Sequence, residues 1–181
     1  MPSKSCGPTR PRPSTEQRRQ RSESSAMQVK LLWPGKAKLP GVSALQEHYL
    51  KRIGELLPVR LIETPSARGW DERWTEKILD REAEGLEKQL KDDYIVTLFD
   101  RGQEMSSAEF ARFFERRAAA GSRSIAFLVG GFLGLAPRLL QRADLQLSLS
   151  RMTYSHELCR LALMEQIYRA LSLMKGRSYA K

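Results

Sequence analysis

The stretch "FLVGGFLGL" (Phe127–Leu135) is an apolar run that ends on two adjacent glycines and resumes around a third. An uninterrupted run of aliphatic and aromatic residues is typical of a buried parallel strand, so we expect a strand that ends at the first glycines. Glycine accepts positive φ values and lets other atoms approach the backbone closely. Two interpretations stay open at this point: a tight structural turn, or a turn that lies against a bound ligand.

On both sides of this stretch, short apolar runs alternate with stretches of helical periodicity. Strands are expected at residues 29–32, 59–64, 94–100, 124–131 and 145–151, and helices at 43–56, 75–90, 106–121, 136–143 and 156–175. Strands separated by helices predict an α/β domain with a mainly parallel sheet flanked by helices. Ligands bind such sheets at the carboxyl ends of the strands, where the glycine turn should lie.

Side chains at the expected helix ends support several of these boundaries. Ser106 and Glu109 match a capping box, and Gly121 follows that helix as a C-cap. Ser43 and Ser155 precede helical stretches and can each serve as an N-cap.

The composition describes one domain that follows a basic extension. The chain has 181 residues and a net charge of +10. Residues 1–26 are rich in Ser, Pro and Arg and lack apolar periodicity, so we expect a disordered extension and then one domain over residues 27–181. The extension carries six Lys/Arg against two acids, so the domain is basic by itself. A basic domain favours a polyanion, nucleic acid first, as its partner.

The extension has two interpretations. Its Arg and Ser content fits an organellar transit peptide. Its prolines disfavour the amphipathic helix of such a peptide and favour a nonfunctional extension, with Met27 as the effective start of the domain. The second interpretation predicts a cytoplasmic protein.

Several kinds of site lack the residues that they need. No stretch approaches the roughly 20 apolar residues that span a bilayer, so no membrane insertion is expected. Two cysteines and two histidines predict no disulfide framework and no metal, and fit a reducing compartment. The glycines do not form G-x-G-x-x-G on a first strand, and no Lys-Ser/Thr follows them. Both absences argue against a dinucleotide-dependent oxidoreductase and a phosphate-binding loop.

The helix expected at 156–175 has two unlike faces. A core face is expected from the apolar stripe of Cys159, Leu163, Met164, Ile167, Ala170, Leu171 and Met174. The other face interleaves apolar and polar residues, as a subunit interface or site lining does: Leu158, Leu161, Tyr168, Glu165, Arg169 and Ser172. The polar segment "SRMTYSH" (150–156) before this helix should lie beside the glycine turn if the strands at 124–131 and 145–151 are neighbours.

Four motifs together resemble a known family: "YIVTL" (94–98), "FLVGGxxGL" (127–135), "SLSRMTYSHEL" (148–158) and "EQIYRALSLMKG" (165–176), with Tyr and Lys near the end of the chain. They are similar to the RlmH (YbeA-type) family of the SPOUT superfamily. These enzymes use S-adenosylmethionine to methylate N3 of a pseudouridine in 23S ribosomal RNA of the large subunit. The resemblance runs from residue 27 to residue 181.

The resemblance implies a SPOUT-type trefoil knot, a homodimer formed through the C-terminal helix, and action on large-subunit RNA or the assembled ribosome. It implies that S-adenosylmethionine lies in the knot and contacts mostly backbone atoms. The cofactor-binding residues that it implies are Leu98, Gly130, Gly131, Leu149, Ser150, Arg151, Met152, Thr153 and Tyr154.

The resemblance also suggests catalytic residues, which are His156, Glu165 and Tyr179. His156 could act near the reacting centre or simply pack the first turn of the helix. Glu165 could act there too, or could pair with Arg169 or lie at the dimer interface.

The chain departs from the family in its tail, where Ala180 replaces a usual histidine, and in Phe132 and Leu133, which make the turn more apolar. Two functions therefore remain: an rRNA methyltransferase, or a catalytically impaired SPOUT-like protein that binds RNA. Exposed cations and a tryptophan among Trp33, Trp70 and Trp74 are candidates for RNA contact, although core or loop packing explains the tryptophans equally well.

Overall fold

The computed structural model describes residues 27–67 and 69–177. The elements follow in the order β1 (Gln28–Pro34), α2 (Pro40–Gly54), β2 (Val59–Thr64), η1 (Glu72–Trp74), α3 (Thr75–Glu87), β3 (Tyr94–Glu104), α4 (Ser107–Ala119), β4 (Ser124–Leu128), α5 (Pro137–Arg142), β5 (Leu145–Ser148) and α6 (His156–Met174). The extension expected at residues 1–26 lies outside the described residues.

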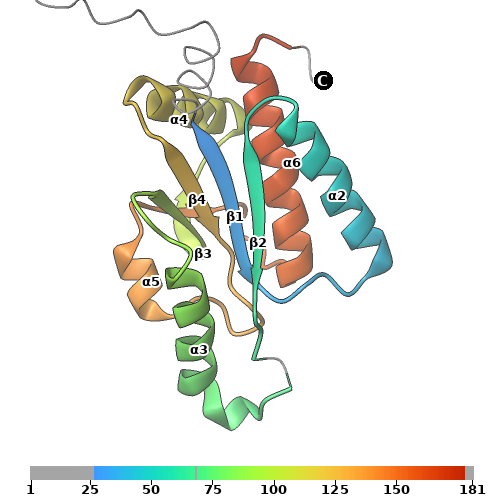
Figure 1. The fold of residues 1–181 in the computed structure, drawn as a ribbon, viewed down its shortest axis with the longest axis vertical. Coiled ribbons are helices and arrows are strands. Elements are labelled where there is room, and N and C mark those ends of the chain that lie inside the picture. Colours follow the sequence, from blue (N-terminus) through green and yellow to red (C-terminus); the bar gives the residue numbers. More distant parts are fainter. Residues whose placement is uncertain (1–26, 68, 178–181) are drawn as a thin grey trace, which may run out of the picture.

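The five strands form one sheet in the order β2-β1-β4-β3-β5. The first four of these strands are labelled in Figure 1. All four pairings are parallel, which confirms the predicted α/β class and makes the described sheet wholly rather than mainly parallel. The strands around the glycine turn and before α6, whose adjacency the sequence left open, are not neighbours, because β3 lies between β4 and β5. The trefoil knot stays a prediction.

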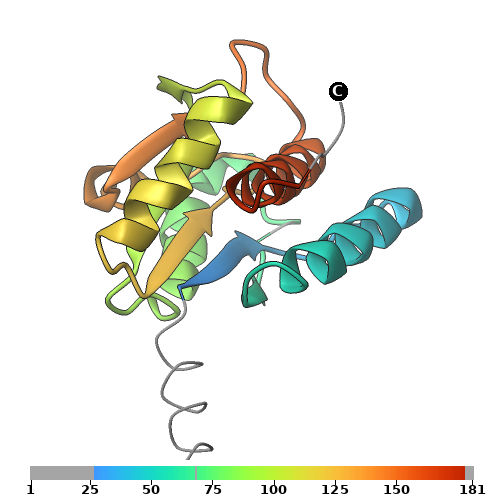
Figure 2. The ribbon, with the colours of Figure 1, turned by 90° about the horizontal axis from the view of Figure 1, so that it is seen from above.

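Helices cover both faces of the sheet. Val29, Leu31 and Trp33 of β1 pack in one apolar cluster with α2, α4 and α6, whereas Leu32 faces the opposite way, toward α3 and α5. Strand side chains alternate between faces, so the two clusters are the two sides of one sheet. Figure 2 shows α2 beside α6 on the first of these sides.

Helix caps agree with the sequence at three ends and differ at one. Ser106 and Glu109 form the predicted capping box, Ser155 caps α6, and Gly121 has the positive φ of +72° that a C-cap glycine adopts. The cap predicted at Ser43 is wrong, because α2 begins at Pro40. Proline fits the first turn of a helix, since its missing N–H has no partner there anyway.

The two faces of α6 are less distinct than the sequence predicts. Leu163, Met164, Ile167, Ala170 and Leu171 are fully buried, as expected of the core face. On the mixed face, Tyr168 and Ser172 are also buried. The Tyr168 hydroxyl accepts a hydrogen bond of 2.6 Å from Arg52 of α2, so this part of the face packs inside the protein rather than lying open.

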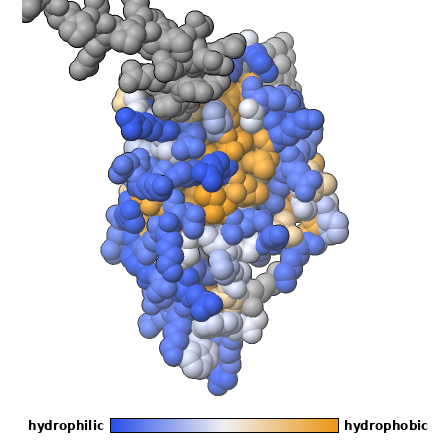
Figure 3. Space-filling view, in the orientation of Figure 1, coloured by the Kyte–Doolittle hydropathy of each residue, from blue (hydrophilic) through white to orange (hydrophobic). Residues whose placement is uncertain are grey.

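Figure 3 shows apolar side chains gathered over β1 and β2, surrounded by hydrophilic residues. Within residues 27–67 and 69–177, no helix is long and apolar enough to cross a membrane. The same residues contain no group of His, Cys, Asp and Glu that could hold a metal ion.

Candidate functional site

A cavity of about 340 Å³ lies at the carboxyl ends of β4 and β5 and beside the middle of β3, the strand between them. Three segments enclose it: the middle of β3, the turn after β4, and the chain from β5 into the first turn of α6. The lining comes from residues 98–100, 129–132, 134, 147–150, 152–156 and 159. The glycine turn and the polar segment before α6 therefore meet at one cavity, although their strands are not neighbours.

The glycine turn has its shape because side chains cannot fit there. A Cβ on Gly130 would lie 2.3 Å from the carbonyl carbon of Gly134, and a Cβ on Gly131 would lie 2.6 Å from a carboxylate oxygen of Glu82. Gly134 has a φ of +82° and donates its N–H to the carbonyl of Gly131 at 3.1 Å. The turn is tight for structural reasons, and it also lines a cavity, so contact with a ligand stays a prediction.

An irregularity in β3 forms the second wall. The pairing of β3 with β5 shifts register between Leu98 and Gln103, so the residues between them leave the ladder. Leu98, Phe99 and Asp100 line the cavity at this point. Irregularities of this kind redirect side chains next to functional sites.

Short-range hydrogen bonds shape the segment after β5. The Ser148 hydroxyl donates to the carbonyl of Ser150 at 3.0 Å, and the N–H of Met152 donates to the Ser150 hydroxyl at 3.0 Å. Met152 and Tyr154 are 75% and 45% exposed. The segment therefore offers backbone groups to the cavity while its larger side chains stay partly in solvent.

The first turn of α6 closes the cavity and anchors a second loop. His156 lines the cavity, and the buried Glu157 accepts hydrogen bonds from the N–H groups of Lys38 and Leu39 at 3.0 and 3.4 Å. Partial burial raises the pKa of Glu157, but the two N–H donors and the nearby Arg160 lower it, so the net pKa lies below the ordinary value. Glu157 thus ties the loop before α2 to the helix that carries His156.

Two further buried charges support the loops at this edge. Arg160 donates to the carbonyl oxygens of Pro34 at 2.6 Å and Gly35 at 3.0 Å, and burial lowers its pKa to about 10, so it keeps its charge at neutral pH. Glu82 of α3 accepts hydrogen bonds from the N–H of Ala67 at 3.1 Å and the Ser66 hydroxyl at 3.2 Å. The loops after β1 and β2 are therefore fixed by charged side chains of α6 and α3.

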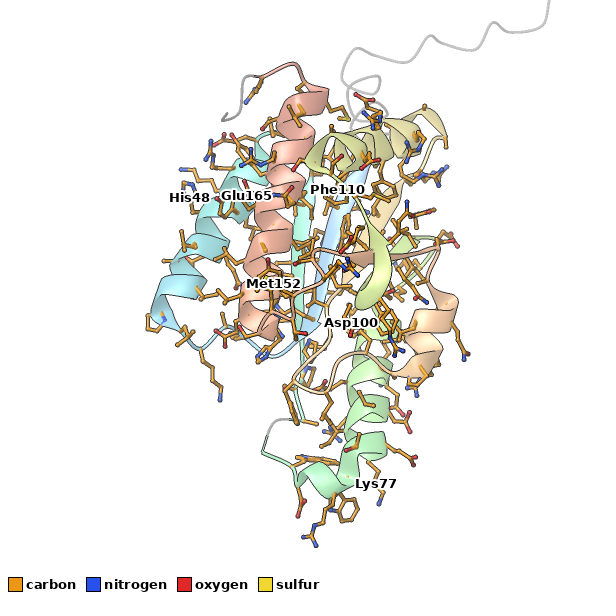
Figure 4. The ribbon with its side chains drawn as sticks, turned by 180° about the vertical axis from the view of Figure 1, so that it is seen from behind. His48, Lys77, Asp100, Phe110, Met152 and Glu165 are labelled. Atoms are coloured by element: carbon orange, nitrogen blue, oxygen red, sulfur yellow. The ribbon has the colours of Figure 1, made fainter. Side chains whose placement is uncertain are left out.

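Two residues suggested by the sequence, Arg151 and Glu165, do not line this cavity, and a third lies outside the described residues. Arg151 lines a neighbouring shallow pocket with Asp100, Arg101 and Thr153. Glu165 lies further along α6, away from Met152 and Asp100 (Figure 4), and binds Arg169 at 2.6 Å. Tyr179 lies outside the described residues, as does Ala180.

Sequence reasoning missed Phe99, Asp100 and Cys159 as lining residues. The position of Asp100 at the predicted end of a parallel strand was a usable signal, since ligands bind at such ends. Cys159 gave no signal, because it reads as one member of an apolar stripe. Burial raises the pKa of its thiol.

The charge of the cavity limits what it can bind. No Lys or Arg belongs to the lining formed by the described residues, and Asp100 is the acid at its rim. Phosphate groups bind where cations or helix N-termini and glycine-rich loops gather N–H donors. An apolar wall with backbone groups and one carboxylate instead fits an organic ligand without phosphate and with positive charge.

Comparisons with known proteins indicate one family. The family described as "Predicted SPOUT methyltransferase" matches residues 27–180. A protein of Enterococcus faecalis named ribosomal RNA large subunit methyltransferase H is 37% identical over 164 residues, which cover 86% of this chain and 100% of that protein. A protein of the same name from Limosilactobacillus reuteri is 35% identical over 159 residues, with the same two coverages.

Solved structures support the fold. A probable methyltransferase from Bordetella pertussis superposes with a TM-score of 0.51 at 14% identity, covering 83% of this chain and 98% of that one. At this level of identity the likeness concerns the arrangement of strands and helices alone.

Proposed function

Because the chain belongs to the SPOUT methyltransferase family, we propose that it transfers a methyl group from S-adenosylmethionine to N3 of a pseudouridine in large-subunit ribosomal RNA. The names of relatives at 35% and 37% identity, which span almost the whole domain, support the RNA substrate. The observation that carries the proposal is the cavity that the middle of β3 and the ends of β4 and β5 enclose with the start of α6.

The residues of the cavity fit S-adenosylmethionine. Its adenine and methionine parts need apolar contact and backbone hydrogen bonds, which Leu98, Gly130 and the segment 149–154 offer, with Arg151 of that segment turned to the neighbouring pocket. Its sulfonium is positively charged, and the cavity has a carboxylate but no Lys or Arg in its described lining. S-adenosylmethionine carries no phosphate. This fits a turn in which Gly130 lies against the backbone of Gly134 and Gly131 lies against the Glu82 carboxylate, which would repel an anion.

The cofactor supplies a methyl group that is already activated by the positive sulfur. What this chain has to supply is alignment of the RNA nitrogen and removal of its imide proton. His156 is our candidate for the proton acceptor, because it lines the cavity and is fixed at the first turn of α6.

The roles proposed for Glu165 and Tyr179 do not rest on the cavity. Glu165 is paired with Arg169 and does not line the cavity, so its proposed role is at an interface rather than at the methyl group. Tyr179 rests on the family resemblance alone, as a tail residue near the RNA target.

The shallow pocket beside the cavity is our candidate for the RNA backbone. It shares Asp100 and Thr153 with the cavity and adds Arg101, Gly102, Glu104 and Arg151. Arg101 forms a 4.0 Å ion pair with Asp100 but is 83% exposed at its side chain, so a phosphate group can still reach it.

We also propose that the protein is a homodimer that acts on ribosomes in the cytoplasm. A groove between α2 and α6 is lined by Leu45, Tyr154, Leu158 and Leu161, and three of these apolar side chains are 45–49% exposed. Clustered apolar side chains at the surface favour a subunit contact. The second copy would cover Glu165 in the same groove.

The test is transfer of labelled methyl groups to ribosomes from a strain that lacks the modification, followed by identification of the nucleoside by mass spectrometry. Label in N3-methylpseudouridine of large-subunit RNA is expected. Tight cofactor binding without incorporation would favour the catalytically impaired RNA-binding protein instead. His156→Ala should lower kcat about 100-fold or more while cofactor affinity changes little.

A further inference from the structure

Two of the three tryptophans lie together at an exposed end of the molecule. Trp70 and Trp74, at the turn and the short helix η1 before α3, are 42% and 47% exposed, whereas Trp33 is fully buried. This end projects beyond the carboxyl edge of the sheet, with Lys77 near its extremity (Figures 1 and 4). Two large aromatic side chains left open on one projection are not explained by core packing.

Each of these rings has a cation over it. Nζ of Lys77 lies 3.9 Å from the centroid of the Trp74 ring, and Cζ of Arg81 lies 5.4 Å from the centroid of the Trp70 ring. A cation over the face of an indole is attracted by the ring and holds it in one orientation. We call Trp70, Trp74, Lys77 and Arg81 the tryptophan tip.

Backbone hydrogen bonds hold the main chain of the same two tryptophans. The N–H of Trp70 donates to the carbonyl of Ala67 at 3.1 Å, and the N–H of Trp74 donates to the carbonyl of Asp71 at 2.9 Å. The tryptophans are therefore attached to hydrogen-bonded turns. A ligand that binds them has little backbone to order, which lowers the entropic cost of binding.

The two cations of the tip form no ion pair among the described residues, because Asp71 is paired with Arg73 and Asp80 is paired with Arg138. Residues 70–81 carry four acids against three Lys/Arg, so the segment as a whole is not basic. The attraction for an anionic partner comes from Lys77 and Arg81 at the two rings. Aromatic faces combined with cations are the combination that binds single-stranded nucleic acid, by stacking on bases and attracting phosphates.

We propose that the tryptophan tip is a second RNA-binding site, which stacks an unpaired base of the substrate RNA at a distance from the methylation cavity. The inference rests on the proposed function, because the RNA is the same molecule that is methylated. The tip and the cavity lie at the same edge of the sheet, where β2 and β4 both end, so one RNA strand can reach both. The tip thereby contributes affinity and register without taking part in the chemistry.

Tryptophan fluorescence reports on this site directly. Trp33 is fully buried, so quenching by added RNA has to come from Trp70 and Trp74. A single-stranded RNA fragment that contains the target nucleotide should quench the fluorescence in a saturable way, and a fully paired duplex of the same sequence should not. Trp70→Phe and Trp74→Phe should each remove part of the signal and keep the affinity, because phenylalanine still stacks.

Substitution separates stacking from other roles. Trp70→Ala/Trp74→Ala should weaken RNA binding and raise KM for RNA about tenfold, with kcat and the affinity for S-adenosylmethionine unchanged. Trp70→Phe/Trp74→Phe is the matched control and should restore most of the affinity. Thermal unfolding of both double variants shows whether the fold is intact.

Three results would overturn the inference. The first is methylation by the wild-type protein with no change in fluorescence on RNA binding. The second is an unchanged KM in the double alanine variant. The third is a raised KM on whole ribosomes but not on protein-free RNA, which would assign the tip to a ribosomal protein. If the wild-type protein transfers no methyl group at all, the proposed function fails, and the fluorescence titration still decides whether the tip binds RNA.

Discussion

The carboxylate of Glu82 lies against Gly131, so close that a Cβ built on the glycine would be 2.6 Å from Oε2 of Glu82. Glu82 is 3% exposed, and its other oxygen accepts hydrogen bonds from the loop at Ser66 and Ala67. Burial raises the pKa of Glu82, and the two hydrogen bonds offset part of that rise. One buried acid of α3 thus holds the loop after β2 and limits the shape of the glycine turn.

This contact predicts a coupling between the two positions. Gly131→Ala should destabilise the fold, because its methyl group would displace the Glu82 carboxylate. In a Glu82→Ser background the same change should cost about 1 kcal/mol less, since the shorter side chain leaves room. Urea unfolding of the four proteins of the cycle measures this coupling, and additive effects within about 0.3 kcal/mol would contradict the contact.

Arg160 is expected to matter for stability far more than a surface arginine of the same helix. Arg160→Met should cost about 3 kcal/mol, because it leaves the carbonyl oxygens of Pro34 and Gly35 without their charged donor. Arg169→Met, which removes a partly exposed ion pair with Glu165 within α6, should cost less than about 1 kcal/mol. Equal losses in chemical denaturation would argue against the anchoring role of Arg160.

The buried pair of Lys30 and Asp93 predicts a pH-dependent stability. Their side chains are 8% and 1% exposed and lie 2.8 Å apart. Burial raises the pKa of Asp93, but hydrogen bonds from Lys30 and the N–H of Lys91 and the charge of Lys30 outweigh this, so the folded pKa lies below 3.8. Because the folded pKa is lowered, the stabilisation by Asp93 is complete above the unfolded value and is lost as pH falls through the folded value.

Asp93→Asn should therefore lower stability by about 3 kcal/mol at neutral pH, and the difference from wild type should shrink below pH 3.8. The neighbouring Asp92→Asn, at an exposed position, is the control and should change little. Thermal unfolding from pH 3 to pH 8 measures both. A difference that stays constant down to pH 3 would show that the ionised carboxylate is not the stabilising group.

The cavity predicts the behaviour of the Cys159 thiol. In a Cys6→Ser background it is the only thiol, and burial raises its pKa above the ordinary value of 9.0. Reaction with a thiol reagent should be slow at pH 7, because little thiolate is present, and should rise with pH up to and beyond pH 9. Saturating S-adenosylmethionine should slow it further, since Cys159 lines the cavity. Equal rates with and without the cofactor would place the ligand elsewhere.

Local sequence signals determined much of the fold. The capping box of Ser106 and Glu109, the cap at Ser155 and the apolar runs of β1 and β4 depend on residues close together in the chain, so they could be read directly. The start of α2 could not, because Ser43 and Pro40 are both acceptable near a helix start. The insertion of β3 between β4 and β5 depends on long-range packing that no local pattern specifies.

In the candidate site, too, local motifs indicated some residues and gave no sign of others. The glycine turn and the segment 149–154 were recognisable from their motifs, and both line the cavity apart from Arg151. The supporting charges were not recognisable, because Glu82 and Arg160 read as ordinary polar positions of amphipathic helices. Their partners are backbone groups of distant loops, and such partners carry no side-chain signature in the sequence.

Calorimetric titration with S-adenosylmethionine is the most direct test of the claim that the cavity at the glycine turn holds the cofactor. Gly130→Ala would force a Cβ to within 2.3 Å of the Gly134 backbone, whereas Gly41→Ala meets nothing within 4 Å and serves as the control. Saturable binding is predicted for the wild-type protein and for Gly41→Ala, with affinity lowered at least about tenfold in a folded Gly130→Ala. Equal affinity in all three proteins would contradict the account.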